Sequence, residues 1–595
     1  MALLVVSPLT AQQDEEADGE ALFEVYCASC HRGKVSVRAP STDALAEFSP
    51  EAIVLALTNG PMRLEGSRIG GSERRAIAEY LTGQNFGGRV DGVDTGWCEA
   101  PSPFENPSTT PSWTTWGARS GNTRFQPEGE AGLTAQEVPR LTLQWALAFP
   151  DATHSWAQPT VAGGRVFVGS HNGTVYSLDA DTGCVHWTFV AAGGVRTAIV
   201  IGLGPGGSGY AAYFGDSNST TYAVDPETGR ELWRQTLDDH PLARVTGTPA
   251  LHDGRLFVPL SSYEEVGTAS PGYGCCTFRG SVSALDTETG EVLWKTYTAP
   301  EPRRRGVSTE GVPLWGPSGV GIWTSPTVDP KRGVVYASTG NAYSAPAGAM
   351  SNAVIAFDME SGAVRWVNQV TPNDVYIGGC RAGTENPNCP EELGPDYDFG
   401  NAPILTTRPD GKEVIVIGQK SGIGYAMDPD DDGRTLWQYR AGRGGALGGL
   451  EYGSAVDARN AYFPVSDIGQ RDAGGLHAVD LITGERVWYA PPAPLLCDEP
   501  RGCDAAQAAA VSVMPGVVFS GSNDGGFRAY STADGSIIWQ YDTNRNFETV
   551  NGIPARGASI LGPGPAIAGG MVFVNSGYGS HGGRAGNVLL AFGLR

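Results

Sequence analysis

The sequence "YCASCH" at residues 26–31 has the C-x-x-C-H spacing, which is the clearest chemical signal in the chain. In this pattern Cys27 and Cys30 would form thioether bonds to a porphyrin, and His31 would bind the iron. A zinc-binding or redox-active C-x-x-C is the alternative, as is a chance match. We interpret the motif as a covalent haem site.

The residues around this motif support that interpretation. The stretch 18–31 has helical spacing, and "GSERRAIAEYLTG" at 71–83 begins with a serine cap and continues as an amphipathic helix. Between them, "LTNGPM" supplies Met62, whose thioether would be the second axial ligand and would raise the haem potential. An ordinary loop methionine is the alternative for Met62. The pattern predicts a small all-α cytochrome c domain.

A second cysteine motif, "GYGCCTFRG" at 272–280, places Cys275 directly beside Cys276. If the two thiols oxidise to each other, they close a small strained ring of the kind found at functional sites. Two free thiols, or two separate partners, are the alternative.

The other cysteines indicate an oxidising compartment. Short spacings suggest local disulfides between Cys380 and Cys389 and between Cys497 and Cys503, and Cys98 and Cys184 are then left to pair with each other. Residues 2–11 resemble the end of a secretory signal, with a possible cut near Ala11, although the basic start of such a signal is missing. We therefore expect a periplasmic or secreted protein, with a leader at 1–16.

Composition narrows the possible partners. The 595-residue chain has a formal net charge of −23, which argues against nucleic-acid binding. No internal stretch is apolar enough to span a bilayer. The 83 glycines and 41 prolines indicate many turns rather than disorder, because 41% of the residues are apolar.

From about residue 141 one pattern recurs: a strand, an Asp/Thr/Gly turn, and a second strand that ends in tryptophan. Such units form hairpins, and stacked units of this length form the blades of a propeller. Trp145 precedes the repeats, and the strand "NVLLAFGLR" ends the chain, so the two chain ends would share an eighth blade. The full units end at Trp187, Trp233, Trp294, Trp366, Trp437, Trp488 and Trp539.

The expected fold class is thus an all-β eight-bladed propeller with a small all-α cytochrome c domain at the N-terminus. We place the cytochrome domain at 17–90, a linker at 91–111 and the propeller at 112–595. Each repeated tryptophan is expected to dock on the neighbouring blade.

This combination resembles the quinoprotein alcohol dehydrogenases, which hold pyrroloquinoline quinone (PQQ) and Ca²⁺ in the central channel. With the haem domain in front, the chain looks most similar to the polyvinyl alcohol dehydrogenases, on the motifs "CCTFRGSVSALDTETGEVLW", "TPNDVYIGGC", "GQKSG" and "FETVNG". The resemblance covers nearly the whole chain.

The resemblance implies a set of cofactor-binding residues. "VTGTPALHDGRLFVPLSSYEE" matches a stretch that places Thr246 and Ser261 on PQQ and Glu264 on calcium, with Glu265 an equal candidate. "GIWTSPTVDPKRGVVYASTGN" places a tryptophan beneath the quinone and an asparagine on calcium. These two residues are Trp323 and Asn341.

The remaining site residues follow in the same way. "QVTPND" ends in Asp374, which the resemblance makes the catalytic base and a calcium ligand. Lys420 in "GQKSG" would lie near the quinone oxygens, and Arg196 in "GGVRTA" would bind a cofactor carboxylate. Ca²⁺ suits the oxygen ligands and would polarise the quinone carbonyl, while Asp374 takes the alcohol proton.

The Cys275–Cys276 ring would then cover the face of the quinone opposite the tryptophan. Two departures from the family pattern bear on this expectation. In many relatives the paired cysteines precede the arginine of an earlier blade, whereas "AAGG" precedes Arg196 here. The first blade has Trp156 and Gln158 where relatives carry an acidic residue, and we assign a role to neither.

The function that the resemblance implies is oxidation of the secondary alcohol groups of polyvinyl alcohol or a similar polymer to ketones, with electrons leaving through the haem to an external cytochrome. A dehydrogenase for small alcohols or sugars is the alternative within the class. A scaffold propeller without a cofactor, or a haem carrier fused to a binding module, is the alternative outside it.

Overall fold

The computed structural model describes residues 18–594 except 33–38, 47, 59–61, 67–68, 70, 86–94, 101, 151, 153, 208, 269–272, 310, 381–385 and 499–501. The chain forms two compact units, Met1–Gly88 and Arg89–Arg595. The leader expected at 1–16 lies outside the described residues.

The first unit is all-α around a small core of Phe23, Ile69 and Ile77, which are fully buried. The side chain of Asp18 caps the first helix by accepting bonds from the backbone N–H groups of Glu20 and Ala21. The helix expected across the haem motif is interrupted at Cys27. The helices are α1 (Gly19–Tyr26), α2 (Ala28–His31), α3 (Thr42–Leu45), α4 (Pro50–Thr58), α5 (Arg63–Gly66) and α6 (Gly71–Thr82).

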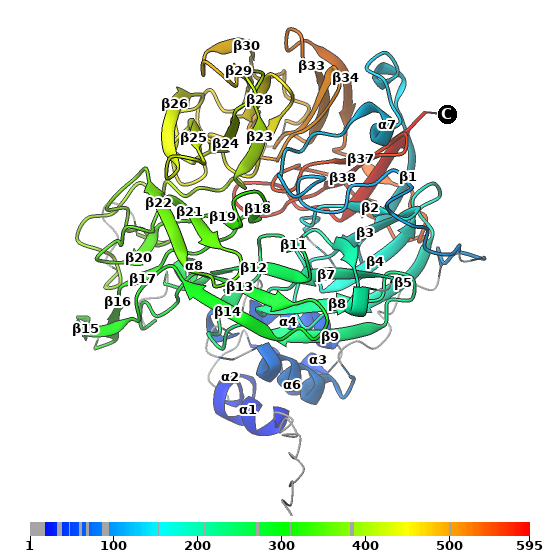
Figure 1. Cartoon of the computed structure of the whole chain (residues 1–595). Helices are drawn as coiled ribbons and strands as arrows, with labels where there is room; N and C mark the ends of the chain where they lie inside the picture. Colours follow the sequence, from blue (N-terminus) through cyan, green and yellow to red (C-terminus); the bar gives the residue numbers. More distant parts are fainter. Residues whose placement is uncertain are drawn as a thin grey trace, which may run out of the picture. The chain divides into compact units, whose positions relative to one another are not determined.

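The second unit is a ring of eight four-stranded antiparallel blades, which confirms the predicted propeller (Figure 1). Blades 1 to 4 are β2 (Thr160–Ala162), β3 (Arg165–Gly169), β4 (Thr174–Asp179), β5 (Val185–Val190); β6 (Val200–Leu203), β7 (Tyr210–Gly215), β8 (Thr220–Val224), β9 (Glu231–Thr236); β11 (Ala250–His252), β12 (Arg255–Ser262), β13 (Ser281–Asp286), β14 (Val292–Tyr297); and β18 (Thr327–Asp329), β19 (Val334–Ser338), β21 (Ala353–Asp358), β22 (Val364–Gln369).

Blades 5 to 8 are β23 (Ile404–Thr407), β24 (Glu413–Gly418), β25 (Ile423–Asp428), β26 (Arg434–Arg440); β27 (Ala455–Val456), β28 (Asn460–Pro464), β29 (Leu476–Asp480), β30 (Arg486–Ala490); β31 (Ser512–Met514), β32 (Val517–Gly521), β33 (Gly526–Ser531), β34 (Ile537–Asp542); and β37 (Ala566–Ala568), β38 (Met571–Ser576), β39 (Val588–Gly593), β1 (Thr142–Ala148). The first strands of most neighbouring blades contact one another. These eight first strands are the inner strands, and they surround the central channel.

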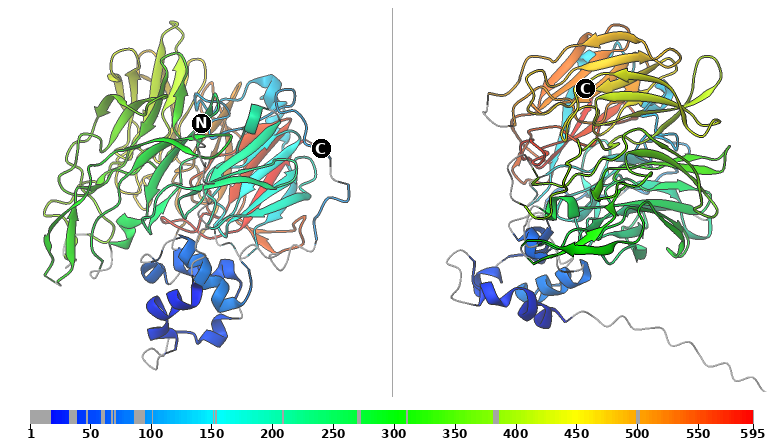
Figure 2. Two further views of the ribbon diagram at one scale, coloured as in Figure 1. Left: turned by 60° about the horizontal axis from the view of Figure 1, so that its bottom comes forward. Right: turned by 90° about the vertical axis from the view of Figure 1, so that its left-hand side faces the viewer.

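Both ends of the propeller sequence form blade 8, as the repeat pattern predicts. Strand β1 pairs with β39 in antiparallel register, with Trp145 opposite Ala591. In Figure 2 the red C-terminal strands lie beside the cyan strands of blade 1. This pairing supplies the outer strand of the last blade from the start of the propeller sequence, and so joins the two ends of that sequence in one sheet.

Further short elements lie in the segments that connect the blade strands or precede them. These are α7 (Glu128–Ala131), β10 (Ala243–Arg244), α8 (Glu264–Gly267), β15 (Arg303–Val307), β16 (Pro313–Gly316), β17 (Ser318–Gly319), β20 (Ala342–Ser344), β35 (Asn546–Phe547), β36 (Ala555–Arg556) and the 3-10 turns η1 (Val138–Arg140) and η2 (Pro205–Gly207). Strand β10 pairs with β12, and β15 and β16 form a hairpin.

The repeated tryptophans join neighbouring blades, as expected. The indole Nε1 of Trp233 donates to the carbonyl of Thr287 in the turn of the next blade, at 2.9 Å. Six other repeat tryptophans make the same bond to Ala180, Pro226, Met359, Leu481, Thr532 and Leu141. The glycine of that turn lies under the ring: a Cβ on Gly290 would come within 2.7 Å of Trp233.

We predict that Gly290→Ala lowers the stability of the propeller more than Gly254→Ala does. Both glycines have a left-handed φ, +78° and +74°, so both substitutions are strained there. At Gly254 the nearest atom to a new Cβ is 3.9 Å away, so only Gly290→Ala also pushes a tryptophan from its site. The free energy of unfolding should be about 1–3 kcal/mol lower for Gly290→Ala than for Gly254→Ala, which a lower urea midpoint would show. Equal midpoints would contradict the docking role of the turn.

Four disulfides are present, which confirms the three expected pairings and the ring of adjacent cysteines. They join Cys98 to Cys184, Cys275 to Cys276, Cys380 to Cys389 and Cys497 to Cys503. The Cys98 bridge attaches the segment from residue 95 onward to blade 1, where Trp97 also pairs with Val185. Much of the segment expected as a linker at 91–111 therefore belongs to the propeller surface.

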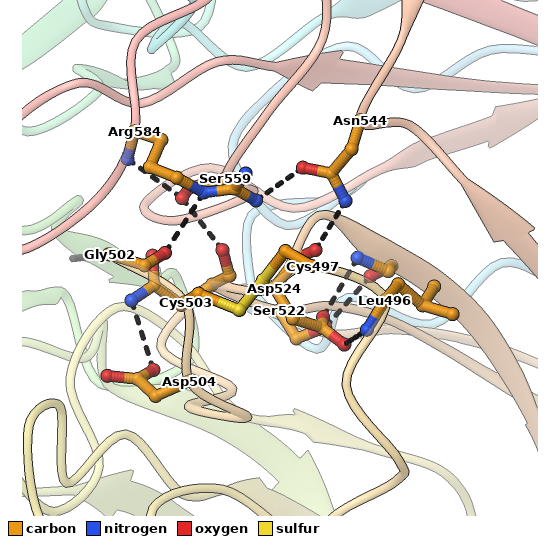
Figure 3. The surroundings of a disulfide bond; sticks show 12 residues. Leu496, Cys497, Gly502, Cys503, Asp504, Ser522, Asp524, Asn544, Ser559 and Arg584 are labelled. Atoms are coloured by element: carbon orange, nitrogen blue, oxygen red, sulfur yellow. Dashed lines mark hydrogen bonds between the residues drawn. A yellow bond between two sulfur atoms is a disulfide. The ribbon is translucent and has the colours of Figure 1, made fainter. Parts of the chain in front are cut away.

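Figure 3 shows how the Cys497–Cys503 loop is fastened to blades 7 and 8. Nε of Arg584 donates to the carbonyl of Gly502 at 3.1 Å, and its backbone N–H donates to Oγ of Ser559 at 2.8 Å. On the other side of the loop, the backbone N–H of Leu496 donates to Asp524 at 3.2 Å. The disulfide thus closes a loop that is held at both ends.

Candidate active site

The haem motif has the geometry that a histidine ligand needs. Nδ1 of His31 lies 2.8 Å from the carbonyl oxygen of Pro40, so Nδ1 carries the proton and Nε2 is left for iron. Cys27 and Cys30 are free thiols, whereas the other eight cysteines form disulfides. These residues fit a covalently attached haem. Met62 lies half-buried in the turn between α4 and α5, and its role as a ligand stays a prediction.

We predict that replacing both Cys27 and Cys30 by alanine abolishes covalent haem attachment. Acidified acetone should then extract the haem from this variant but not from the parent protein, because thioether bonds survive acid. The matched control is Cys98→Ala/Cys184→Ala, which removes a disulfide and should retain all covalent haem. Retention of haem by the Cys27/Cys30 variant would contradict the assignment.

At the propeller axis, several of the predicted PQQ contacts come together. Arg196, Thr246 and Trp323 line one cavity, which we call the central pocket, together with Trp116 and Tyr452 among others. They come from the loops that precede the inner strands of blades 2, 3 and 4. Thr246 in turn hydrogen-bonds Ser261, with the two hydroxyls 2.7 Å apart. The guanidinium of Arg196 lies over the ring of Tyr452, at 5.4 Å.

The two adjacent glutamates at the start of α8 have different surroundings. Glu264 is fully buried, and its carboxylate accepts bonds from the N–H groups of Thr277 and Phe278, at 2.8 and 2.9 Å, and from the hydroxyl of Tyr273 at 3.0 Å. Nε2 of His240 lies 3.4 Å away. Although burial opposes its charge, His240 and these donors hold the pKa of Glu264 below its usual range. The carboxylate of Glu264 therefore holds the loop of residues 273–278, which carries Cys275 and Cys276 and which we call the cysteine loop.

Glu265 instead belongs to a group of acids around one lysine. Burial, together with the nearby carboxylates of Asp398 and Asp374, raises the pKa of Glu265 to about 7, while Lys420 opposes the rise. Lys420 is 6% exposed, and its Nζ lies 2.7 Å from Oδ1 of Asp396 and 4.0 Å from Oδ2 of Asp398. Burial opposes the charge on Lys420, but the surrounding carboxylates outweigh it and raise the pKa of the lysine.

Asp374 lies within this group, but its carboxylate is occupied. It accepts bonds from the backbone N–H groups of Tyr397 and Asp396, at 2.7 and 3.2 Å, and from the amide of Asn352 at 2.7 Å. Asp374 is fully buried, and burial raises its pKa. These contacts hold the turn that carries Asp396 and Asp398.

Asn341 and Asp398 present oxygen atoms next to the predicted position of the quinone. The amide of Asn341 donates to the carbonyls of Ala342 and Tyr376, both at 2.8 Å, so it can only accept at Oδ1. Asp398 accepts from the backbone N–H of Asn341 at 2.6 Å and from Nε1 of Trp323 at 3.0 Å. The donors in this region are hard oxygens, which fit Ca²⁺.

In the described part of the chain, no three His, Cys, Asp or Glu side chains converge as a finished metal site. A cation here would therefore need the Asn341 oxygen and oxygens of the cofactor to complete its shell. Asp396 and Asp398 were not predicted from the sequence. The signal that was available is the "DYD" at 396–398, two carboxylates in a long insertion between blades 4 and 5.

The disulfide of Cys275 and Cys276 confirms the predicted ring. The ring is buried, and the carbonyl of Cys275 accepts a bond from the backbone N–H of Trp315 at 2.7 Å. Glu264 accepts hydrogen bonds from the backbone N–H groups of Thr277 and Phe278, the two residues that follow the ring. The stacking of the Cys275–Cys276 ring on a quinone stays a prediction.

The comparisons with known proteins agree with this arrangement. The family described as "Outer membrane protein assembly factor BamB" matches residues 140–383, 279–494 and 472–592, and the family described as "Cytochrome C oxidase, cbb3-type, subunit III" matches 14–81. A polyvinylalcohol dehydrogenase of Pseudomonas sp. is 42% identical over 100% of this chain and 96% of its own length. One from Sphingopyxis sp. (strain 113P3) is 39% identical over 98% and 93%.

Solved structures share the fold. A europium-containing methanol dehydrogenase superposes with a TM-score of 0.61 at 18% identity, covering 82% of this chain and 99% of its own. The quinohemoprotein alcohol dehydrogenase of Comamonas testosteroni does so with a TM-score of 0.58 at 19% identity, covering 85% and 82%.

The eight-bladed ring, the haem motif and these relatives define a quinohaemoprotein alcohol dehydrogenase, an enzyme class that oxidises alcohols with PQQ and passes the electrons to haem c. Calcium is typical of this class. Within the class, the chain belongs to the polyvinylalcohol dehydrogenase family.

Proposed function

We propose that this enzyme oxidises the secondary hydroxyl groups of polyvinyl alcohol, or of a similar polymer, to ketones. Support for the substrate comes from the two full-length relatives, both named polyvinylalcohol dehydrogenase. The observation that carries the proposal is the buried charge group in which Lys420 faces both Asp396 and Asp398. Asp398 in turn accepts hydrogen bonds from Trp323 and from the backbone of Asn341, so a cation and carboxylates lie next to those two residues.

Each predicted cofactor contact has a physical role in this proposal. When bound, PQQ accepts a hydride from the alcohol carbon, and Ca²⁺ polarises its carbonyl. Arg196, Thr246 and Ser261 would hold its carboxylates, and Trp323 would support its ring. The residues that would bind the metal are Glu265, Asn341 and Asp398, and we place Glu265 there in preference to Glu264.

For the general base we favour Asp396 over Asp374. Asp374 already accepts three hydrogen bonds that hold the neighbouring turn. Asp396 is held through Oδ1 by Lys420, and burial raises its pKa well above the usual range although Lys420 opposes the rise. A carboxyl with a raised pKa is better suited to take a proton from an alcohol.

The electron acceptor and the compartment are parts of the same proposal. The haem domain would hand electrons to an external cytochrome or a similar carrier. Four disulfides favour an oxidising compartment, and we place the enzyme in the periplasm or outside the cell. None of the helices in the described residues is long and apolar enough to cross a membrane.

The test is an anaerobic titration of the protein loaded with PQQ and Ca²⁺, followed by the absorbance of reduced haem. Polyvinyl alcohol should reduce the haem, ethanol should do so with a much lower kcat/KM, and omission of PQQ should abolish both reactions. Preference for ethanol would favour a small-alcohol enzyme. Failure of every alcohol to reduce the haem would favour a non-enzymatic propeller.

A further inference from the structure

The long turn between β38 and β39 of blade 8 lies on the same face of the ring as the candidate site. We call residues 577–584, in this turn, the blade 8 loop. Because neighbouring strands of a blade are antiparallel, β38 ends beside the start of the inner strand β37. The blade 8 loop therefore lies with the loops that precede the inner strands, which carry Arg196, Thr246 and Trp323.

The Cys497–Cys503 loop holds the blade 8 loop in place. Figure 3 shows Arg584, at the end of the blade 8 loop, bonded to the carbonyl of Gly502 beside the disulfide. Nδ2 of Asn523 donates to the carbonyl of Gly582 at 3.3 Å. A Cβ on Gly502 would come within 2.7 Å of Cγ of Arg584 and 3.1 Å of the carbonyl oxygen of Gly582. The two loops are thus closely packed, and the blade 8 loop is fixed from outside.

His581 lies in this loop with an uncommon backbone conformation. Its φ is +52°, in the left-handed region that residues other than glycine seldom adopt. Such conformations cost free energy and gather at sites where function requires them. The side chain is half-buried, and its Nδ1 lies 2.9 Å from Oγ of Ser580. Nε2 makes no hydrogen bond to any described residue, so it is available to a ligand.

The ring of Tyr578 connects His581 to the central pocket. The centroids of the two rings are 6.2 Å apart. The guanidinium of Arg196, which lines the central pocket, lies 5.8 Å from the ring centroid of Tyr578. Tyr452 also lines the pocket, and its ring centroid is 6.1 Å from that of Tyr578. The blade 8 loop therefore places a histidine one aromatic ring away from the pocket wall.

The charges near His581 keep its imidazole neutral. Burial lowers the pKa of this imidazole to about 4, and the charges of Arg196, Lys420 and His154 add to the effect. At neutral pH the ring therefore has one N–H donor and one acceptor nitrogen. If Ser580 donates to Nδ1, Nε2 carries the proton and donates. If Nδ1 donates to Ser580, Nε2 accepts. A hydroxyl group both donates and accepts, so it suits either form.

The substrate proposed above offers such a hydroxyl at a fixed spacing. In polyvinyl alcohol the hydroxyl groups recur on every second carbon, so the one being oxidised has a neighbour two carbons away. Because Arg196 and Lys420 are expected to hold the cofactor, His581 lies at the edge of the space where the alcohol would react. We propose that Nε2 of His581 hydrogen-bonds the neighbouring hydroxyl and thereby selects 1,3-diols over isolated secondary alcohols. This inference rests on the proposed function.

The test compares pentane-2,4-diol with pentan-2-ol on the enzyme loaded with PQQ and Ca²⁺, with kcat/KM expressed per hydroxyl group. The parent enzyme should prefer the diol. His581→Phe should lower the ratio of the two kcat/KM values by about five- to tenfold, since one hydrogen bond is lost. His581→Gln is the matched control, because it strains the left-handed backbone as Phe does but keeps a donor and an acceptor. Its ratio should stay within about threefold of the parent value, and the urea midpoints of the two variants should agree.

An unchanged ratio in His581→Phe would overturn the inference. So would an equal fall in both variants, since the shape of the loop rather than a hydrogen bond would then set the preference. A parent enzyme that oxidises polyvinyl alcohol but treats the diol and the simple alcohol alike would also overturn it, with the polymer function intact. Oxidation of the small alcohols with none of polyvinyl alcohol would instead contradict the proposed function, and this inference with it. The two failures are thus distinguishable.

Discussion

Asp396→Asn should lower kcat by about 10²–10⁴-fold, the range that a positioned general base contributes. The substitution keeps the size of the side chain and can still accept a bond from Lys420 at Oδ1, but it removes the group that takes the proton. KM for the alcohol should change much less than kcat, because the loss is felt in the transition state. Steady-state rates with an artificial electron acceptor measure both constants.

Asp374→Asn is the matched control for this prediction. Its amide would face two backbone N–H groups that now donate to a carboxylate, so we expect a loss of stability of about 1–3 kcal/mol. Its effect on kcat should be smaller than that of Asp396→Asn. If Asp374→Asn abolishes turnover at unchanged stability while Asp396→Asn remains active, Asp374 is the base and our preference is wrong.

Glu265→Gln should weaken Ca²⁺ binding by about tenfold or more. Even the loss of a group that only supports a metal ligand lowers metal affinity by about 10–100-fold. The neutral amide removes a negative charge from the group around Lys420, and with it one of the oxygen donors proposed for the cation. Calcium titration followed by calorimetry on the PQQ-loaded protein gives the affinity directly.

Glu264→Gln separates the two adjacent glutamates. Its amide could not accept from Thr277, Phe278 and Tyr273 at once, so we expect the cysteine loop to loosen and the disulfide of Cys275 and Cys276 to be reduced faster by dithiothreitol. Calcium affinity should stay within about threefold of the parent value. A large loss of calcium affinity in Glu264→Gln, with none in Glu265→Gln, would reverse the assignment.

The propeller could be predicted from the sequence because its signals are local and repeated. Each Trp-ended hairpin carries its own turn glycine, and the ring of eight follows from counting the units and adding Trp145 to the last strand. The haem motif is equally local. Cysteine pairing was accessible because adjacent or closely spaced cysteines leave few partners.

The choice of metal ligand and of general base depends on the directions in which side chains point, and sequence patterns do not encode these directions. Glu264 and Glu265 are neighbours of the same type, and only the path of α8 sends one carboxylate to the cysteine loop and the other toward Lys420. The roles of Asp374 and Asp396 are similarly set by a turn in a long insertion, which brings the N–H of Tyr397 to Asp374. The segment 112–126 carries no motif, because it bonds mainly through its backbone to inner strands that are distant in sequence.

The most direct measurement is a crystal structure of the protein with PQQ and Ca²⁺, with the metal located by its anomalous scattering. We predict one metal peak at the propeller axis, bound by oxygens of Glu265, Asn341 and Asp398, with the quinone between Trp323 and the ring of Cys275 and Cys276. A metal bound elsewhere, or a quinone outside the central pocket, would contradict the account.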